Sequence, residues 1–143
     1  MTYIVLLALS VLYPRQQLNL STGEVIRNVN FIVEASERFQ VPTTLVLSIC
    51  WQESRLGLDP DSASMCGIRL RGRWVRDPRQ SAEIAARSLA NAYRTCGSME
   101  MAVRNRLGHG CHSQDPINYV GDVMARFARL EEETIIQQRI NGY

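Results

Sequence analysis

Glu53 is the residue of this sequence whose type and surroundings best suit acid–base chemistry. It ends the most apolar helical segment of the chain, where helical spacing places it on one face with Val46, Ile49 and Cys50. Acidic residues are rarely buried without a reason. Apolar neighbours and the negative end of the helix dipole both favour a protonated carboxyl, which is the form that a glycosidic general acid requires. A solvated glutamate at a helix terminus is the plainer interpretation, and these residues leave it open.

The four cysteines are the second chemically distinctive set. They stand at positions 50, 66, 96 and 111 and form no Cys-x-x-Cys pair. An even number at wide spacing favours two disulfides in an oxidising compartment, and three pairings are possible. His109 and His112 flank Cys111, but the ligand spacing of a zinc finger is missing. We therefore expect no metal site, and nothing in the sequence indicates a cofactor.

Arginine supplies all 16 basic residues, yet the formal net charge is only +2. So small a charge does not by itself indicate a nucleic-acid-binding protein. A local concentration of arginines nevertheless surrounds Trp74, at positions 69, 71, 73, 76 and 79. A basic stretch with one aromatic residue can bind single-stranded nucleic acid. A solvated loop, or a lip that contacts an anionic cell wall, is the simpler interpretation.

The segments that must position these residues are predicted to be helices separated by glycine and proline. Residues 21–24 have the form of a capping box, and apolar residues follow at helical spacing as far as Phe39. Pro42 is expected at the first position of the next helix, which is apolar nearly all round. Gly57 is expected to end that helix.

The second half of the chain continues the helical pattern after one long connection. Residues 57–78 lack periodicity, and long connections in compact domains are usually functional. A helix capped by Asp77 and a short helix at 98–107 follow. The last helix is expected to start at Asp115, with Ile117 in its buried stripe. No strand pattern of useful length appears, so the predicted class is all-α with a single core.

Residues 1–18 form an apolar N-terminal segment, which we separate from a domain at 19–143. Its apolar run, residues 3–13, is too short to cross a bilayer as a helix, which needs about 20 residues. The length suits the core of a signal peptide, but no basic residue precedes it and no Ala-x-Ala site follows. An export signal or anchor and a first core helix both remain open.

Four short motifs, taken together, resemble those of the soluble lytic transglycosylase family, whose members contain a lysozyme-like domain. They are, in chain order, VPTTLVLSICWQESR at 41–55, ASMCGIRL at 63–70, AVRN at 102–105 and YV at 119–120. The first motif of the family is an apolar helix that opens near a proline and ends in a catalytic Glu-Ser. Each motif alone is weak, but the order and spacing of all four match, and the resemblance as a whole covers roughly residues 28–130.

The resemblance implies an all-α fold, a single lysozyme-like domain of about five to seven helices with a glycan-binding cleft. In this family the glutamate protonates the oxygen that links N-acetylmuramic acid to N-acetylglucosamine. It then acts as a base on the sugar's own C6 hydroxyl and releases a 1,6-anhydro product without water. One carboxylate therefore suffices, whereas most glycosidases use two.

The same resemblance assigns roles around Glu53, the one implied catalytic residue. Tyr119 would place its hydroxyl near the Glu53 carboxyl, and Asn105 would hydrogen-bond the substrate or orient Glu53. Ser54 is included among the substrate-binding residues, and its hydroxyl could brace the turn after Glu53. The other substrate-binding candidates are Gly67, Ile68, Arg69 and Arg104.

The chain departs from the family pattern at Arg69-Leu70, where the family has Met-Gln, and at Arg104, where it has Tyr. These guanidinium groups could pair with carboxylates on the peptide stems of peptidoglycan. They could instead pair with Glu53, which would favour its ionised form and impair a general acid. A carboxyl locked onto a guanidinium, with no groove beside it, would argue against bond cleavage.

The layout of the motifs also favours one pairing of the cysteines. Cys50 lies one helical turn before Glu53, and Cys66 directly precedes the glycine that is expected to face it. Cys96 and Cys111 bracket the third motif. We therefore expect the disulfides Cys50–Cys66 and Cys96–Cys111.

The leading hypothesis is a peptidoglycan lytic transglycosylase that opens the cell wall locally. Its expected partner is the peptidoglycan glycan strand, with proteins of a virion or a secretion machine as further partners. Its expected location is periplasmic, secreted or virion-associated. An inactive lysozyme-like component that binds glycan or has a structural role is the alternative from another class, and a hydrolytic lysozyme is the second alternative.

Overall fold

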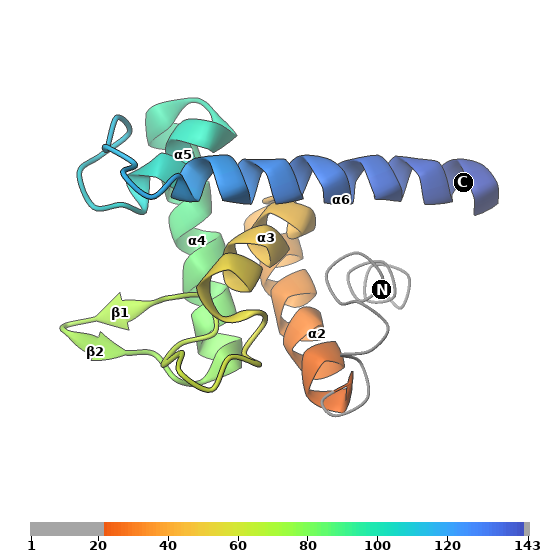
Figure 1. The fold of residues 1–143 in the computed structure, drawn as a ribbon, viewed down its shortest axis with the longest axis horizontal. Coiled ribbons are helices and arrows are strands. Elements are labelled where there is room, and N and C mark those ends of the chain that lie inside the picture. Colours follow the sequence, from red (N-terminus) through yellow and green to blue (C-terminus); the bar gives the residue numbers. More distant parts are fainter. Residues whose placement is uncertain (1–21, 142–143) are drawn as a thin grey trace.

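The computed structural model describes residues 22–141, which form five helices and one short hairpin (Figure 1). In chain order the elements are α2 (Thr22–Phe39), α3 (Thr43–Ser54), β1 (Arg69–Leu70), β2 (Arg73–Trp74), α4 (Pro78–Cys96), α5 (Met99–Asn105) and α6 (Tyr119–Asn141). The predominance of helix agrees with the predicted all-α class. The apolar segment at 1–18 and its boundary at 19 lie outside the described residues. Within residues 22–141, none of the helices has the length and apolar character that crossing a bilayer requires.

Helix α3 forms the centre of the hydrophobic core and packs against α2, α4 and α6. Its side chains Leu45, Val46 and Ile49 are fully buried. Each such burial stabilises the fold by roughly 1.5–3 kcal/mol. In Figure 1, α6 runs across the molecule above α3, while α2 and α4 flank it. Residues at the end of α3 are therefore held in place by the packing of the whole core.

Both ends of α3 differ slightly from the sequence prediction. Pro42 has extended backbone (φ −61°, ψ 122°) and is the N-cap, not the first helical residue. The helix ends at Arg55, whose backbone is left-handed (φ 52°), before the chain reaches Gly57. Leu56 is also left-handed (φ 59°) and fully buried. Burial of the Leu56 side chain offsets the cost of this conformation and draws the chain out of the helix early.

The caps of α4 and α5 follow the sequence prediction. The Asp77 carboxylate accepts a hydrogen bond from the backbone N–H of Gln80, which fixes the start of α4. Gly97 ends that helix in the left-handed region (φ 84°). The Ser98 hydroxyl then accepts from the N–H of Met101 and starts α5. These local signals hold α5 close to the C-terminal end of α4.

The connection at 57–78 contains a two-stranded antiparallel hairpin that the sequence did not indicate. Arg69 pairs with Trp74, and Leu70 pairs with Arg73. The two turn residues, Arg71 and Gly72, both have positive φ (52° and 78°). Two successive left-handed residues match the twist of a hairpin. Each strand has only two residues, which is too short for an alternating pattern to be visible in the sequence.

The last helix starts at Tyr119, not at Asp115 as predicted. Asn118 adopts a left-handed backbone (φ 58°), which prevents an earlier helical start. The Asp115 carboxylate instead accepts hydrogen bonds from the N–H groups of Tyr119 and Val120 (2.7 and 2.8 Å). Ile117 precedes the helix and is 76% exposed, so its prediction as a buried residue was wrong.

Both expected disulfides are present. Cys50–Cys66 joins α3 to the loop that follows it, and Cys96–Cys111 joins the end of α4 to the loop after α5. No cysteine is left free among the described residues. Two structural disulfides indicate an oxidising compartment, such as the cell exterior or the periplasm.

Candidate active site

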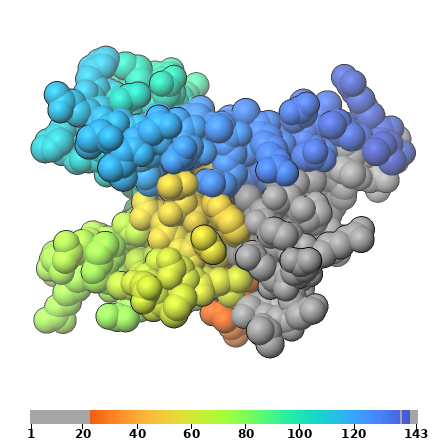
Figure 2. All heavy atoms as spheres, viewed as in Figure 1, coloured from red at the N-terminus to blue at the C-terminus, as the bar shows by residue number. Residues whose placement is uncertain are grey.

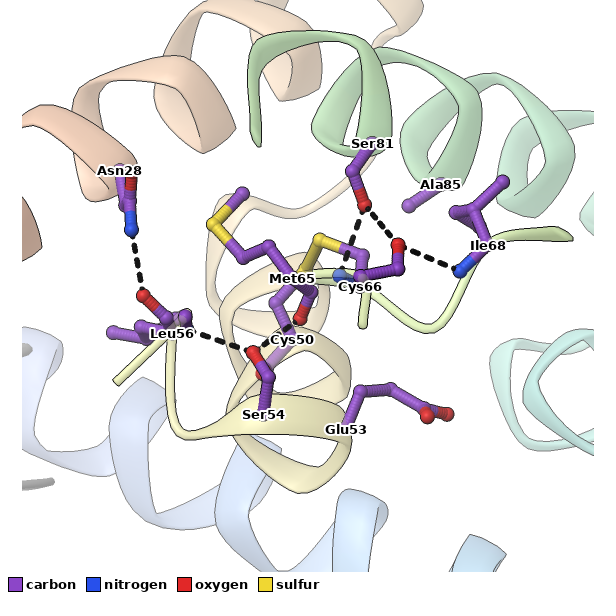
Figure 3. The surroundings of a disulfide bond; sticks show 12 residues. Asn28, Cys50, Glu53, Ser54, Leu56, Met65, Cys66, Ile68, Ser81 and Ala85 are labelled. Carbon is purple, nitrogen blue, oxygen red and sulfur yellow. Dashed lines mark hydrogen bonds between the residues drawn. A yellow bond between two sulfur atoms is a disulfide. The ribbon is translucent and has the colours of Figure 1, made fainter. Parts of the chain in front are cut away.

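The last turn of α3 carries Glu53, and the Cys50–Cys66 disulfide fixes this turn against the following loop. In Figure 3 the Glu53 side chain extends from the end of the helix away from the disulfide. It is 27% exposed and therefore remains within reach of a ligand. The neighbouring Ser54 is buried and points the other way, toward Met65 (Figure 3). The hydroxyl of Ser54 donates to the Met65 carbonyl (2.6 Å) and accepts from the Gly57 N–H (2.7 Å).

Two buried serines hold the loop opposite Glu53 onto α4. The Ser81 hydroxyl accepts from the N–H of Cys66 (2.9 Å) and lies 3.0 Å from the Ser64 hydroxyl. Ser64 in turn accepts from the N–H of Ile68 (3.0 Å). Figure 3 shows this chain of hydrogen bonds running from α4 through the disulfide loop. The loop therefore has a fixed backbone, and no pattern in the sequence indicated a role for either serine.

Gly67 lies directly against the Glu53 side chain. A Cβ atom at this position would stand 2.9 Å from Glu53 Cγ and closer still to the carboxyl group. The backbone of Gly67 is also left-handed (φ 69°), a conformation that favours glycine. Both facts require glycine here. The Glu53 carboxyl therefore packs directly against the Gly67 backbone, with no side chain between them.

Tyr119 brings α6 to the same carboxyl. Its hydroxyl donates a hydrogen bond to Glu53 Oε1 (2.8 Å), and only 7% of the residue is exposed. Burial raises the pKa of Tyr119 to about 12, with the Arg106 cation opposing this shift and the Glu53 carboxyl adding to it. The hydroxyl therefore keeps its proton throughout the neutral range. Asp115 fixes the start of α6 and so positions this donor.

Arg106 is a residue of the site that the sequence prediction missed. Its Nη2 atom lies 3.7 Å from Glu53 Oε1 and donates to the Cys66 carbonyl (2.7 Å). The side chain is only 13% exposed, and its buried Nε has no hydrogen-bond partner among the described residues. The sequence prediction named Arg69 and Arg104 as arginines that could pair with Glu53. The guanidinium that reaches the carboxyl belongs instead to Arg106, which directly follows α5.

A groove of about 330 Å³ opens beside this cluster. Glu53 borders it through contacts with Gly67 and Arg106, which are both part of the lining. The lining residues are Gly67, Ile68, Arg69, Leu70, Ile84, Ser88, Ala92, Ala102, Asn105 and Arg106. Figure 2 shows the surface hollowed between the hairpin and the part of the chain around α5. None of these lining residues carries a carboxylate.

The remaining predicted site residues divide into two groups. Ile68, Arg69 and Asn105 line the groove together with Gly67. Arg104 does not line it, because its guanidinium donates to the Ser113 carbonyl (3.1 Å) and pairs with Glu100. Arg69 stacks on the ring of Trp74, 4.7 Å from its centroid.

No group of three or more potential metal ligands occurs among residues 22–141. In comparisons with known proteins, no protein-family model, no curated protein and no solved structure matches the chain. The features of the described residues that indicate a function are the cluster of Glu53, Gly67, Arg106 and Tyr119 and the groove beside it.

Proposed function

We propose that the protein is a peptidoglycan lytic transglycosylase with a lysozyme-like fold, in which Glu53 is the single catalytic acid and base. The order of four motifs similar to those of the soluble lytic transglycosylases supports this proposal. The observation that carries it is the Glu53 carboxyl, which lies between the Tyr119 hydroxyl and bare backbone at Gly67, beside a groove.

In the proposed reaction the Glu53 carboxyl acts twice, first as an acid and then as a base. Glu53 gives its proton to the oxygen between N-acetylmuramic acid and N-acetylglucosamine, and the bond from C1 to that oxygen breaks. The C6 hydroxyl oxygen of the muramic acid residue then bonds to C1 while Glu53 takes up the hydroxyl proton. No water is consumed. Because no carboxylate lines the groove among the described residues, an external nucleophile or second base of the usual kind is not supported.

Tyr119 and Arg106 are positioning residues in this scheme. The Tyr119 hydroxyl donates to the same oxygen that Arg106 approaches, so both hold Glu53 Oε1 while Oε2 remains beside Gly67. The distance of 3.7 Å between Arg106 Nη2 and Glu53 Oε1 is longer than a hydrogen bond. Glu53 is therefore paired loosely, with a groove beside it, and is not locked onto the guanidinium.

The Arg106 contact also favours the second candidate function, a non-catalytic protein that binds glycan as a structural part of a virion or secretion machine. Arg106 Nη2 and the Tyr119 hydroxyl both contact Glu53 Oε1, and such contacts also occur around a carboxyl with a purely structural role. The two disulfides support a periplasmic, secreted or virion-associated location for either function.

Zymography with purified peptidoglycan tests the proposal. We expect native protein to clear the substrate and Glu53→Gln, which keeps the shape of the side chain, to leave it intact. Mass spectrometry of the products then separates the two chemistries, because a 1,6-anhydro end is lighter than a reducing end by one water. A native protein that clears nothing would support the non-catalytic candidate, and a reducing end would indicate a hydrolytic lysozyme.

A further inference from the structure

We propose that the β1–β2 hairpin binds carboxylates on the peptide stems of the glycan strand that occupies the groove. This inference rests on the proposed function, because it names a second part of the same substrate and the surface that recognises it. Arg69 and Leu70 form strand β1 and also line the groove. The hairpin is therefore continuous with the groove, and in Figure 1 it projects away from the helices.

The hairpin carries a concentrated positive charge that the described part of the protein does not neutralise. Arg69, Arg71 and Arg73 in the hairpin, and Arg76 shortly after it, are all exposed. Within residues 22–141, no acidic side chain forms an ion pair with any of these four. By contrast, Arg79 at the start of α4 pairs with Glu34. Four uncompensated charges beside a groove are complementary to an anionic ligand.

The hairpin also orients its first guanidinium. Arg69 and Trp74 are directly paired across the two strands, and the guanidinium of Arg69 lies over the exposed indole ring. Stacking occupies the face of the planar group and leaves the N–H donors at its edge available. A fork held in this way suits a carboxylate, which accepts two parallel hydrogen bonds.

Arg71 occupies a position where folding alone would favour another residue. It is the first of two turn residues with positive φ, which are normally Asn, Asp or Gly. An arginine is disfavoured there by the contact of its Cβ with the backbone. Local stability therefore does not explain this arginine, whereas a contact between the hairpin tip and an anion does.

The peptide stems are the anions that the geometry favours. They branch from the glycan strand and carry carboxylates, so a strand that lies along Ile68, Leu70 and Ala92 in the groove would bring them toward the hairpin. Nucleic acid is a less suitable ligand, since the net charge of the whole chain is only +2.

Binding is tested with Glu53→Gln as the parent protein, so that the ligand stays intact. One ligand is insoluble peptidoglycan freed of phosphate-bearing polymers. The other, the stripped glycan, is the same material after an amidase has removed the stems and the lactyl carboxylates exposed by that cleavage have been converted to amides. We expect Arg71→Asn and Arg73→Gln each to weaken binding to intact peptidoglycan by up to about fivefold, the range of an exposed ion pair. Neither should change binding to stripped glycan. Arg71→Asn should fold at least as stably as the parent, since Asn tolerates positive φ.

Arg27→Gln is the matched control, because Arg27 is exposed on α2, a helix that contributes no residue to the groove. Equal losses on intact and stripped glycan, or losses no larger than that of Arg27→Gln, would overturn the inference. Tighter retention on single-stranded DNA than on intact peptidoglycan would overturn it as well. If native protein binds intact peptidoglycan through the hairpin but releases no product, the inference stands and the proposed cleavage fails.

Discussion

Replacing Gly67 by alanine is the most direct perturbation of the proposed acid. The new Cβ would stand 2.9 Å from Glu53 Cγ and closer to the carboxyl, so the Glu53 side chain must move away. Its hydrogen bond from Tyr119 at 2.8 Å would then be lost. We expect lytic activity to fall by about 100-fold or more, since a displacement of about 1 Å can cost that much. The left-handed backbone (φ 69°) adds a strain of about 1–2 kcal/mol.

Gly72→Ala provides a matched control for that strain. Gly72 is also left-handed (φ 78°), but a Cβ there would meet nothing within 4 Å. Both variants should therefore lose similar stability from the backbone. Gly67→Ala should lose a further 0.5–1.5 kcal/mol, roughly, for the hydrogen bond from Tyr119 to Glu53.

Urea unfolding measures the free energy of unfolding of both variants, and release of soluble fragments from peptidoglycan measures their activity. The reasoning predicts that Gly72→Ala, which lies in the turn of the hairpin, loses no more than the roughly fivefold expected for the hairpin arginines. It would be refuted if Gly67→Ala kept native activity while it folded as stably as Gly72→Ala, because the Glu53 position would then not matter.

Three further variants test two contacts of Glu53 and the second disulfide. The pKa of Tyr119 is raised from 10.0 to about 12 in the folded state, so its contribution to stability is complete below pH 10 and is lost as the pH rises to 12. When the pH is raised from 9 to 11, the free energy of unfolding measured in urea should therefore fall less for Tyr119→Phe than for the parent protein. Equal falls for the two proteins would contradict this. Arg106→Met leaves the Cys66 carbonyl without its donor, so it should lower the free energy of unfolding by about 1–3 kcal/mol and reduce lysis. Arg106→Lys should partly restore both. A gain of activity at unchanged stability would show instead that the ion pair restrains Glu53. Replacing Cys96 and Cys111 together by alanine should lower the free energy of unfolding by about 3 kcal/mol, the value of the chain-entropy model for a loop of 15 residues. An unchanged midpoint of urea unfolding would count against a structural role for this disulfide.

The parts of the fold that were predictable from sequence are those with local signals. Asp77 and Gly97 bound α4, and Ser98 starts α5, because each cap forms between neighbours in the chain. The start of α6 was less predictable. There Asp115 acts across a turn at Asn118, and this combination of an Asp cap and a left-handed residue displaced the helix start to Tyr119.

The identity of the arginine near Glu53 depends on packing and not on local pattern. Arg104 and Arg106 are two residues apart, so they point in different directions at the end of α5. Arg104 is held by Ser113 in the loop after α5, whereas Arg106 reaches the Cys66 carbonyl, 40 positions earlier in the chain. Only the packed arrangement of α3, α5 and the disulfide loop decides between them.

The distribution of charge along the groove separates the two tasks proposed for this protein. Glu53 borders the groove at Gly67 and Arg106, whereas uncompensated arginines lie on the hairpin that begins at Arg69. A substitution on the hairpin would therefore change how tightly the substrate is held, and a substitution at Glu53 would change only the chemical step. Because the groove lining supplies no carboxylate among the described residues, the proposed reaction relies on the substrate's own C6 hydroxyl as the group that attacks C1. A 1,6-anhydro end on the product is therefore the result that separates this proposal from a hydrolytic lysozyme, in which water would attack C1.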